Sequence, residues 1–448
     1  MDTSTAFFCA RALFWIFAAG CLFSSKRTSV AFYLLLIQID ASGPQFESTG
    51  SIGFENLLRI VAIPAVMAYR YGLLEYLRKP WSIPAKFWGA LTVYAVVAST
   101  WSPYPISAIK MVGYFVSYLL LVPVLLGAWR EGAINRRMLF WNVVLVLSMG
   151  VLQTYILNNP FGSLEEKSRF TTFTAPQALA AYMLSVLAAL SIDEKPDWHN
   201  RLGKMLCILG ILLTGSRYVF VGMIAFFILR ALLANRTITF AGIVRRLAVY
   251  AIIVAICVSL IAYFAPDSRV NELILTARQL DVSGEDIGTW IWRLAIYAQA
   301  VSRISQWTGR EYIMGAGTSA SGEVILAANF AFLNESNVDA NRAMHNEFLR
   351  VFYEWGGVGI LLFIGFLVSI FAVAWREARQ SRSGTATAVI AMAPAIIASL
   401  AIENLLANPG APGGTGYLLC FTMGLAFATA RVSSPASNLA YADKQAAP

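Results

Sequence analysis

Long runs of apolar residues recur along this chain and limit what it can fold into. The runs near 105–128, 138–157 and 217–234 approach or reach the roughly 20 residues that an α-helix needs to cross a hydrocarbon core. Of the 448 residues, 58% are hydrophobic and only 13% are charged. The sequence therefore predicts an all-α polytopic membrane protein with about twelve transmembrane helices.

The apolar runs also predict a topology. They cover residues near 7–23, 28–40, 52–70, 86–101, 105–128, 138–157, 174–192, 202–214, 217–234, 246–264, 346–375, 385–406 and 415–431. The loops richest in lysine and arginine alternate along the chain, so we expect them all on the cytoplasmic side. We expect N-terminal membrane helices over 1–264, an extracytoplasmic helical loop over 265–345, C-terminal membrane helices over 346–431 and a cytoplasmic tail over 432–448.

The net charge of +9 needs no nucleic-acid partner, because basic residues gather in the cytoplasmic loops of membrane proteins. The five cysteines all lie inside apolar runs, which indicates packing rather than disulfides or zinc. No nucleotide-binding P-loop, metal-binding DxD or HExxH motif, or EF-hand occurs, and the isolated Gly315-x-Gly317 pair implies no nucleotide. The sequence thus predicts neither a metal nor a cofactor.

His345 is one of only two histidines, and it stands where the long polar loop ends and an apolar run begins. Asp339-Ala340-Asn341 offers a helix cap, so we expect His345 in the first turn of a helix. The positive end of the helix dipole disfavours a cation there and keeps the imidazole neutral, as a general base requires. The alternative is a histidine that merely lies at the headgroup boundary.

Several basic residues on the same outward side could bind phosphate. Arg217 follows the turn Thr214-Gly215-Ser216, and its planar fork of donors suits a phosphate group, although an interfacial arginine can also serve only to reach water. The long loop has six arginines but nine acidic residues, so only selected arginines would bind an anion. We expect Arg293 to be one, because aromatic and apolar neighbours would hold it at the membrane surface.

Two further residues enter the prediction by position. Arg169 precedes a helix start marked by Pro176. Lys110 lies just inside the helix that follows the outward turn 102–104, and a lysine at membrane depth indicates function unless a partner such as Glu403 makes it structural.

Taken together, several of these segments resemble the O-antigen ligase family. They are "TGSR" at 214–217, "FTAPQALAAY" at 173–182, "SPYPISAIK" at 102–110 and "HNEFLRVFYEWG" at 345–356. One departure is Gln177, which stands where the wider superfamily usually has asparagine.

The resemblance implies a GT-C-like glycosyltransferase of the bacterial inner membrane. It would transfer polysaccharide from undecaprenyl pyrophosphate to lipid A–core oligosaccharide on the periplasmic face, in a membrane-lipid environment and without a metal. His345 would be catalytic, and Arg217, Arg293 and Arg169 would bind the pyrophosphate. We expect Asn346, Lys110 and Arg342 to support them.

Three other activities stay open at this point. An O-antigen polymerase and a protein O-oligosaccharyltransferase use the same kind of donor, so the sequence separates them poorly from a ligase. A transporter of lipid-linked glycans is a more remote alternative, because the sequence shows no inverted repeat.

Overall fold

The computed structural model describes residues 3–39, 54–78, 81–157, 170–173, 176–192, 197–234, 285–333, 344 and 346–381. Within these ranges the chain is helical and forms no strand; one isolated bridge joins Ile39 to Phe173. The predicted segments 246–264, 385–406 and 415–431 lie outside the described residues, as does the tail.

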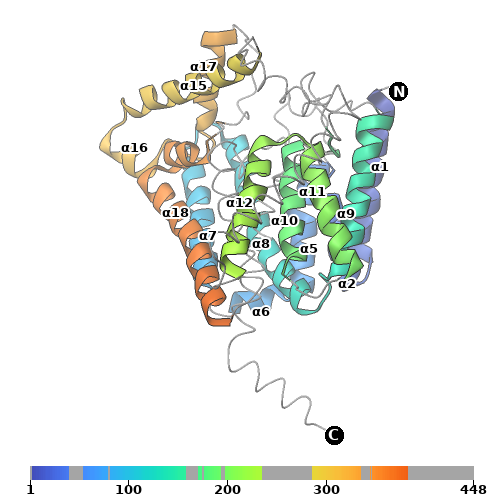
Figure 1. Ribbon diagram of the computed structural model, residues 1–448. Coiled ribbons are helices and arrows are strands. Elements are labelled where there is room, and N and C mark those ends of the chain that lie inside the picture. The colour runs from blue at the N-terminus through green and yellow to red at the C-terminus, as the bar shows by residue number, and fades with distance from the viewer. Residues whose placement is uncertain are drawn as a thin grey trace.

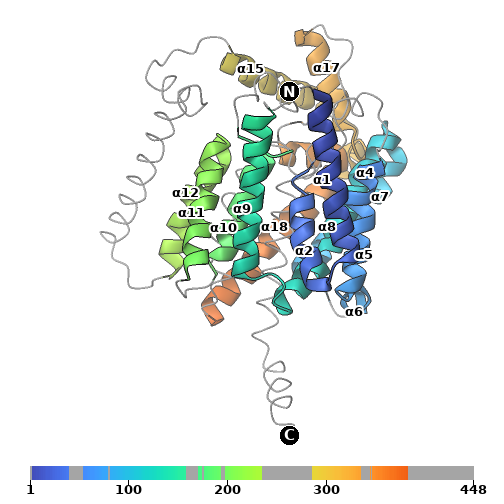
Figure 2. The ribbon, with the colours of Figure 1, turned by 90° about the vertical axis from the view of Figure 1, so that its right-hand side faces the viewer.

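The described helices form an up-and-down bundle with a smaller helical layer at one end (Figures 1 and 2). The N-terminal half contains α1 (Thr3–Phe23), α2 (Lys26–Leu36), α4 (Phe54–Leu57), α5 (Ile63–Arg70), α6 (Leu73–Arg78), α7 (Ile83–Ala98), α8 (Pro105–Arg130) and α9 (Arg136–Val151). After α9 the chain forms α10 (Pro176–Leu190), α11 (Trp198–Leu213) and α12 (Arg217–Ala234). Beyond residues 235–284, which are not described, it forms α15 (Glu285–Ile304), α16 (Gly309–Met314), α17 (Ser321–Leu333) and α18 (Glu347–Ser381). Two π-helical turns, Leu58–Ala62 and Leu152–Ile156, and a 3₁₀ turn, Ser99–Trp101, complete the list.

Three of these helices are long and apolar enough to cross a membrane. They are Pro105–Arg130, Arg136–Ile156 and Glu347–Arg376, and the most apolar window of the last has a mean hydropathy of 2.6. Phe8–Phe23 and Ala178–Leu190 are shorter apolar helices. The prediction of an all-helical membrane protein is confirmed for the described part of the chain.

Aromatic side chains join α7, α8 and α18 at the centre of the bundle. Trp88 of α7 stacks on Phe115 of α8 with ring centroids 5.0 Å apart, and it also contacts Phe366 of α18 at 4.8 Å. Phe115 in turn meets Trp355 edge-on at 5.3 Å. Such rings bury large apolar areas and prefer these offset or edge-on geometries, so α18 is held firmly against α7 and α8.

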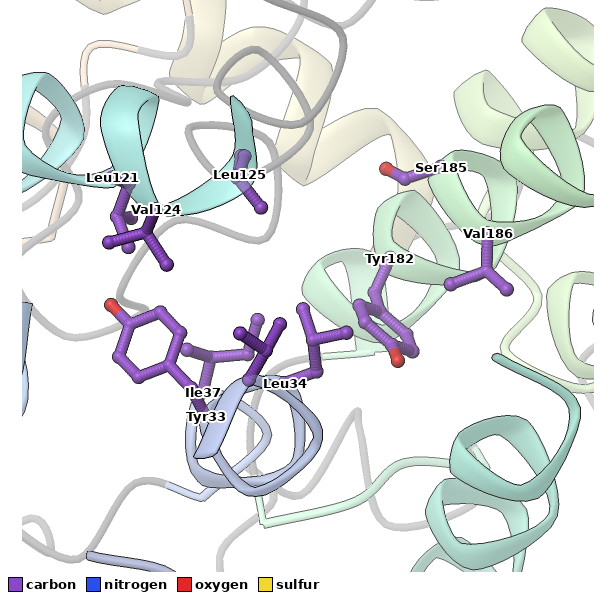
Figure 3. Close-up of a pocket in the computed structure, with 10 residues that line it drawn as sticks. Tyr33, Leu34, Ile37, Leu121, Val124, Leu125, Tyr182, Ser185 and Val186 are labelled. Atoms are coloured by element: carbon purple, nitrogen blue, oxygen red, sulfur yellow. The ribbon is translucent and has the colours of Figure 1, made fainter. Parts of the chain in front are cut away.

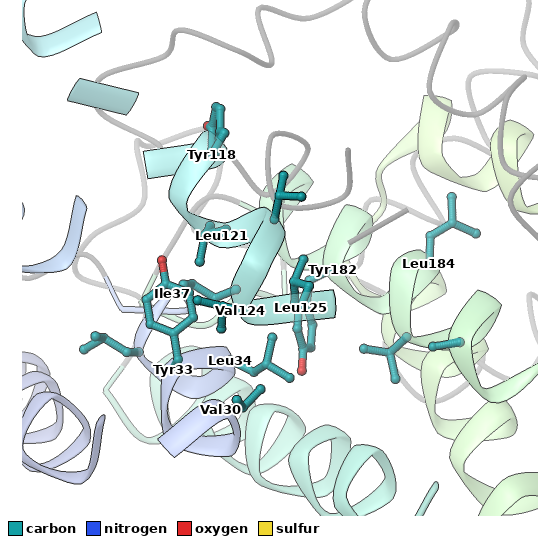
Figure 4. Packing of buried hydrophobic residues seen from close by; sticks show 14 of the residues in the cluster. Val30, Tyr33, Leu34, Ile37, Tyr118, Leu121, Val124, Leu125, Tyr182 and Leu184 are labelled. Carbon is teal, nitrogen blue, oxygen red and sulfur yellow. The ribbon is translucent and has the colours of Figure 1, made fainter. Parts of the chain in front are cut away.

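A second contact region lies between α2, α8 and α10, where apolar side chains surround a small pocket (Figure 3). Tyr33 and Leu34 project from α2, Val124 from α8 and Tyr182 from α10. The same side chains belong to the main buried cluster of the bundle, which packs these three helices together (Figure 4). The pocket is thus part of the helix packing and is almost wholly apolar.

Helices α15, α16 and α17 form a cap over one end of the bundle (Figures 1 and 2). The cap has its own buried core, which Ile296 and Ala300 of α15, Val324 of α17 and Tyr353 of α18 share. Met344 is fully buried in the same core. The chain is therefore anchored to the cap directly before residue 345.

Helix α18 is broken in its third turn, at Gly356, whose φ of 59° and ψ of −155° are not helical. The break frees backbone carbonyls, which a membrane helix cannot leave unsatisfied. The amides of Ala316 and Gly317 donate to the carbonyls of Tyr353 and Glu354, both at 2.9 Å. A loop of the cap thus completes the hydrogen bonding of the broken helix.

Glycine is required on both sides of this contact. A Cβ atom on Gly315, which has a φ of 74°, would lie 2.4 Å from the backbone of Glu354 and Trp355. A Cβ atom on Gly356 would lie 2.5 Å from the backbone of Ile313. The Gly315-x-Gly317 pair therefore has a structural role, consistent with the expectation that it implies no nucleotide site.

We expect Gly356→Ala to lower the free energy of unfolding by about 2 kcal/mol or more, because it adds a positive-φ penalty to a backbone clash. Gly357→Ala is the matched control, since its Cβ atom would meet only the Tyr312 carbonyl at an ordinary 3.4 Å. Unfolding of both variants in mixed micelles measures the difference. Equal stability of the two variants would contradict the described break.

Candidate functional site

The alternation of helix directions brings several predicted segments to the capped end of the bundle. The turn that ends α7, the start of α10, the turn between α11 and α12, and the start of α18 all lie at this end (Figure 1). These segments carry or adjoin Lys110, Arg169, Arg217 and His345. Of these residues, Lys110 and the backbone of Arg217 are described and lie at the capped end; the side of the membrane that they face stays a prediction.

The turn before Arg217 is built from side chains that satisfy the local backbone. Thr214 Oγ1 donates to the Ile211 carbonyl at 2.7 Å and accepts from the Ser216 amide at 3.4 Å. Gly215 adopts a φ of 62°, which closes the turn. Helix α12 then begins at Arg217, as the sequence predicted.

The other predicted residues fall into two groups. The backbone of Arg293 lies in the middle of α15, while Lys110 lies in the second turn of α8 and is partly buried. His345, Arg169 and Arg342 lie outside the described residues, as do the side chains of Arg217 and Arg293.

Asn346 is the N-cap of α18. Its Oδ1 accepts from the Leu349 amide at 3.1 Å, and its carbonyl accepts from the Arg350 amide at 3.0 Å. The helix therefore begins at Glu347, and the prediction that His345 lies in its first turn was wrong. Asparagine is among the strongest N-cap residues, and the buried Met344 lies two residues before it.

The first turns of α18 carry a buried charge cluster, which consists of Glu347, Arg350 and Glu354. All three are at most 1% exposed. Arg350 donates from Nε to Glu347 Oε1 at 3.0 Å, with a second, shorter bond from Nη2, and from Nη1 to Glu354 Oε2 at 2.8 Å. Ser321 of α17 donates to Glu354 Oε1 at 2.5 Å. The spacing i, i+3, i+7 places all three charges on one helix face.

The charge cluster also contacts α8. Arg350 Nη1 lies 3.2 Å from the sulfur of Met111, which follows Lys110 in the chain. The guanidinium lies over the ring of Trp355 at 5.2 Å, and Trp355 donates to Thr318 Oγ1 at 3.0 Å. Of the predicted site residues, the structure therefore brings Lys110 and Asn346 to neighbouring elements, with the charge cluster between α8 and α18.

The turn before α8 is fixed to the cap. Ser102 Oγ donates to the Thr318 carbonyl at 2.5 Å. Arg303 and Glu323 form an ion pair across α15 and α17 at 2.6 Å. Burial raises the pKa of the Tyr104 phenol, Glu323 raises it further and Arg303 opposes both. The 102–105 turn thus contacts the loop before α17 through Ser102 and Thr318.

Glu347, Arg350 and Glu354 were not among the residues predicted from the sequence. The signal was available, because three charged residues at one-turn spacing open a run that is otherwise apolar enough to cross a membrane. Ionisable residues at membrane depth are rare and usually functional or paired. What the sequence did not show was that all three would be buried together.

These features define a helical membrane protein whose candidate site lies at one end of the bundle, beneath a folded cap and beside a buried charge cluster. Residues 202–364 match the O-antigen ligase family, whose members are glycosyltransferase-like ligases and polymerases. The match over residues 202–364 confirms the predicted resemblance to the O-antigen ligase family. A comparison with curated proteins found no match.

We expect Arg350→Met to lower the free energy of unfolding by about 3–5 kcal/mol, because two buried carboxylates lose their common partner. Arg303→Met is the matched control: its ion pair with Glu323 is 34% exposed on both sides and contributes at most about 1 kcal/mol. Unfolding of both variants in mixed micelles provides the comparison. A loss for Arg350→Met as small as that of the control would show that the charge cluster does not hold α18 in place.

Proposed function

We propose that this protein is an O-antigen ligase, which transfers polysaccharide from undecaprenyl pyrophosphate to lipid A–core oligosaccharide. The observation that carries the proposal is the extent of the family match. Residues 202–364 include Arg217, Arg293 and His345 together with the whole charge cluster. The matched segment therefore contains a candidate base, two candidate anion-binding residues and the charge cluster that holds the start of α18 in place.

The proposal includes a topology. About twelve helices cross the bacterial inner membrane, and the loop over 265–345 lies in the periplasm with the active site beneath it. Residues 1–264 and 346–431 supply the membrane helices, and residues 432–448 the cytoplasmic tail. The alternation of the described helices supports this arrangement, because it places the cap and the candidate segments at one end.

His345 acts as the general base. The acceptor is a sugar hydroxyl, a poor nucleophile that reacts faster when a neutral imidazole takes its proton. Helix α18 begins two residues after His345, so the positive end of its dipole still disfavours an imidazolium at rest. The donor sugar is already joined to pyrophosphate, so the transfer needs no ATP, and attack from the opposite face inverts the anomeric carbon.

Arginines stabilise the leaving pyrophosphate in place of a metal. Arg217 is the first residue of α12, where unpaired backbone amides and the helix dipole also favour an anion. Arg293 and Arg169 supply further charge-assisted hydrogen bonds to the phosphate oxygens. Lys110, Asn346 and Arg342 support these groups from neighbouring positions.

The hydrocarbon parts of both substrates need an apolar surface beside the site. The first turn of α8 offers one, since Ile106 and Ile109 are 63% and 62% exposed and adjoin Lys110. In a membrane such side chains face lipid tails. This supports a donor whose polyprenyl chain stays in the bilayer while its pyrophosphate reaches the capped end.

We expect His345→Ala to fold normally and to lose glycan transfer by about 10²-fold or more. The assay uses purified protein in vesicles with lipid-linked glycan, lipid A–core and excess chelator. His199→Ala is the matched control: His199 lies at the opposite end of α11, where its Nδ1 pairs with Asp197 at 3.0 Å, so this variant keeps wild-type turnover. Full activity of His345→Ala would remove the proposed base, and a strict requirement for Mg²⁺ or Mn²⁺ would remove the metal-free mechanism.

The lipopolysaccharide of a null strain distinguishes a ligase from a polymerase. Loss of a ligase leaves long glycans on the lipid carrier and bare core in the outer membrane. Loss of a polymerase leaves core that bears a single repeat unit. The second pattern would replace the proposed ligase with a polymerase that uses the same donor.

A further inference from the structure

The two carboxylates of the charge cluster differ in how their oxygens are used. Both oxygens of Glu354 accept hydrogen bonds, Oε1 from Ser321 and Oε2 from Arg350. Arg350 approaches Glu347 with two donors, but both reach Oε1. Glu347 Oε2 is buried and has no donor among the residues that the structure describes. One carboxylate is thus saturated and the other keeps a buried acceptor unused.

An unused buried acceptor is costly. Leaving such a group unsatisfied costs about 1–3 kcal/mol, and more when it is charged. Folded proteins satisfy about 90% or more of their buried polar groups, and the exceptions often have a catalytic role. The Glu347 side chain is 0% exposed, so bulk water does not compensate. An N–H donor close to Glu347 in the chain would satisfy Oε2.

Chain connectivity indicates which donor that is. Residue 345 lies two positions before Glu347, so their Cα atoms are at most about 7 Å apart. The only other histidine of the chain, His199, lies in the first turn of α11, at the end of that helix away from the cap. If His345 is the base, the ring nitrogen that takes the proton is unprotonated at rest, so the other ring nitrogen already carries an N–H that can donate.

Other charged groups lie on α18 itself and on the helices that pack against it. On α18 they are Arg350 and Glu354, whose bonds are given above. On the elements packed against α18 they are Lys110 of α8, Arg303 of α15, Arg310 and Glu311 of α16, and Glu323 of α17. Arg303 pairs with Glu323, and Glu311 caps α16 through the Thr308 amide at 2.7 Å.

We propose that Glu347 is a positioning residue for His345: its Oε2 accepts a hydrogen bond from the ring N–H opposite the nitrogen that takes the proton, and this bond strengthens as the imidazolium forms. This inference rests on the proposed function. The hydroxyl proton moves to one ring nitrogen, the new glycosidic bond replaces the bond to pyrophosphate, and the second ring N–H donates to Glu347. Glu347 forms no covalent bond and gains no proton.

Two opposing electrostatic effects act on the protonation of His345. The dipole of α18 disfavours the imidazolium, whereas the Glu347 carboxylate favours it. A general base works best when its affinity for protons matches the working pH. Arg350 holds Glu347 by Oε1 and so aims Oε2, which gives the buried charge cluster a role beyond stability.

The test compares Glu347→Gln with Glu354→Gln in the full-length protein in vesicles. Each variant removes one negative charge from Arg350, so both lose stability to a similar extent. Glu347→Gln lowers kcat per folded molecule by roughly 10²- to 10⁴-fold and leaves KM within about twofold. The acid limb of its kcat profile moves to lower pH, because an imidazole without the carboxylate protonates less readily. Glu354→Gln keeps the wild-type acid limb.

The proposal is overturned if Glu347→Gln and Glu354→Gln share one kcat and one acid limb. If Glu347→Gln does not fold, Glu347→Asp takes its place: a wild-type kcat with the shortened side chain overturns the proposal, and a reduced kcat at unchanged KM supports it. His345→Ala separates the two levels. If His345→Ala is active, the proposed function is wrong. If His345→Ala is inactive but Glu347→Gln has wild-type kinetics, only the proposed role of Glu347 is wrong.

Discussion

The burial of Arg350 is the constraint on which the capped end depends. A guanidinium removed from water is stable only with carboxylate partners and further hydrogen bonds. Its carboxylate partners are Glu347 and Glu354 on the same helix, and Ser321 of α17 donates a further hydrogen bond to Glu354. Because Met111 of α8 and the ring of Trp355 also contact the guanidinium, one buried cation determines how α8, α17 and α18 meet.

The break of α18 at Gly356 also leaves backbone polar groups that need partners from elsewhere in the protein. Non-helical backbone is tolerated at membrane depth only where protein satisfies its polar groups. The cap provides this through the amides of Ala316 and Gly317. The first turns of α18 thus contact both the cap, through Tyr353, and the bundle, through Val351 and Trp355. A lipid-borne donor and a lipid-borne acceptor would meet at this boundary, between hydrocarbon and water.

Much of the fold could be predicted because apolar runs and helix signals are local. The start of α12 at Arg217 and of α10 at Pro176 followed from a Gly turn and a proline, and both were confirmed. The start of α18 was wrong, because Asp339, Asn341 and Asn346 are all good N-caps. The hydrogen bonds that Asn346 makes to the Leu349 and Arg350 amides identify it as the N-cap of α18.

The sequence by itself determined a helical membrane protein, the end of the bundle that carries the candidate residues, and the resemblance to O-antigen ligases. These follow from hydrophobic length, charge alternation and short motifs, which need no knowledge of distant contacts. Only the tertiary structure decided that Glu347, Arg350 and Glu354 form one buried charge cluster and that Glu347 keeps a free oxygen. The cluster also contacts Met111 of α8 and Ser321 of α17, which are distant from it in the sequence. Whether the three charges are buried therefore depends on how those helices pack against α18.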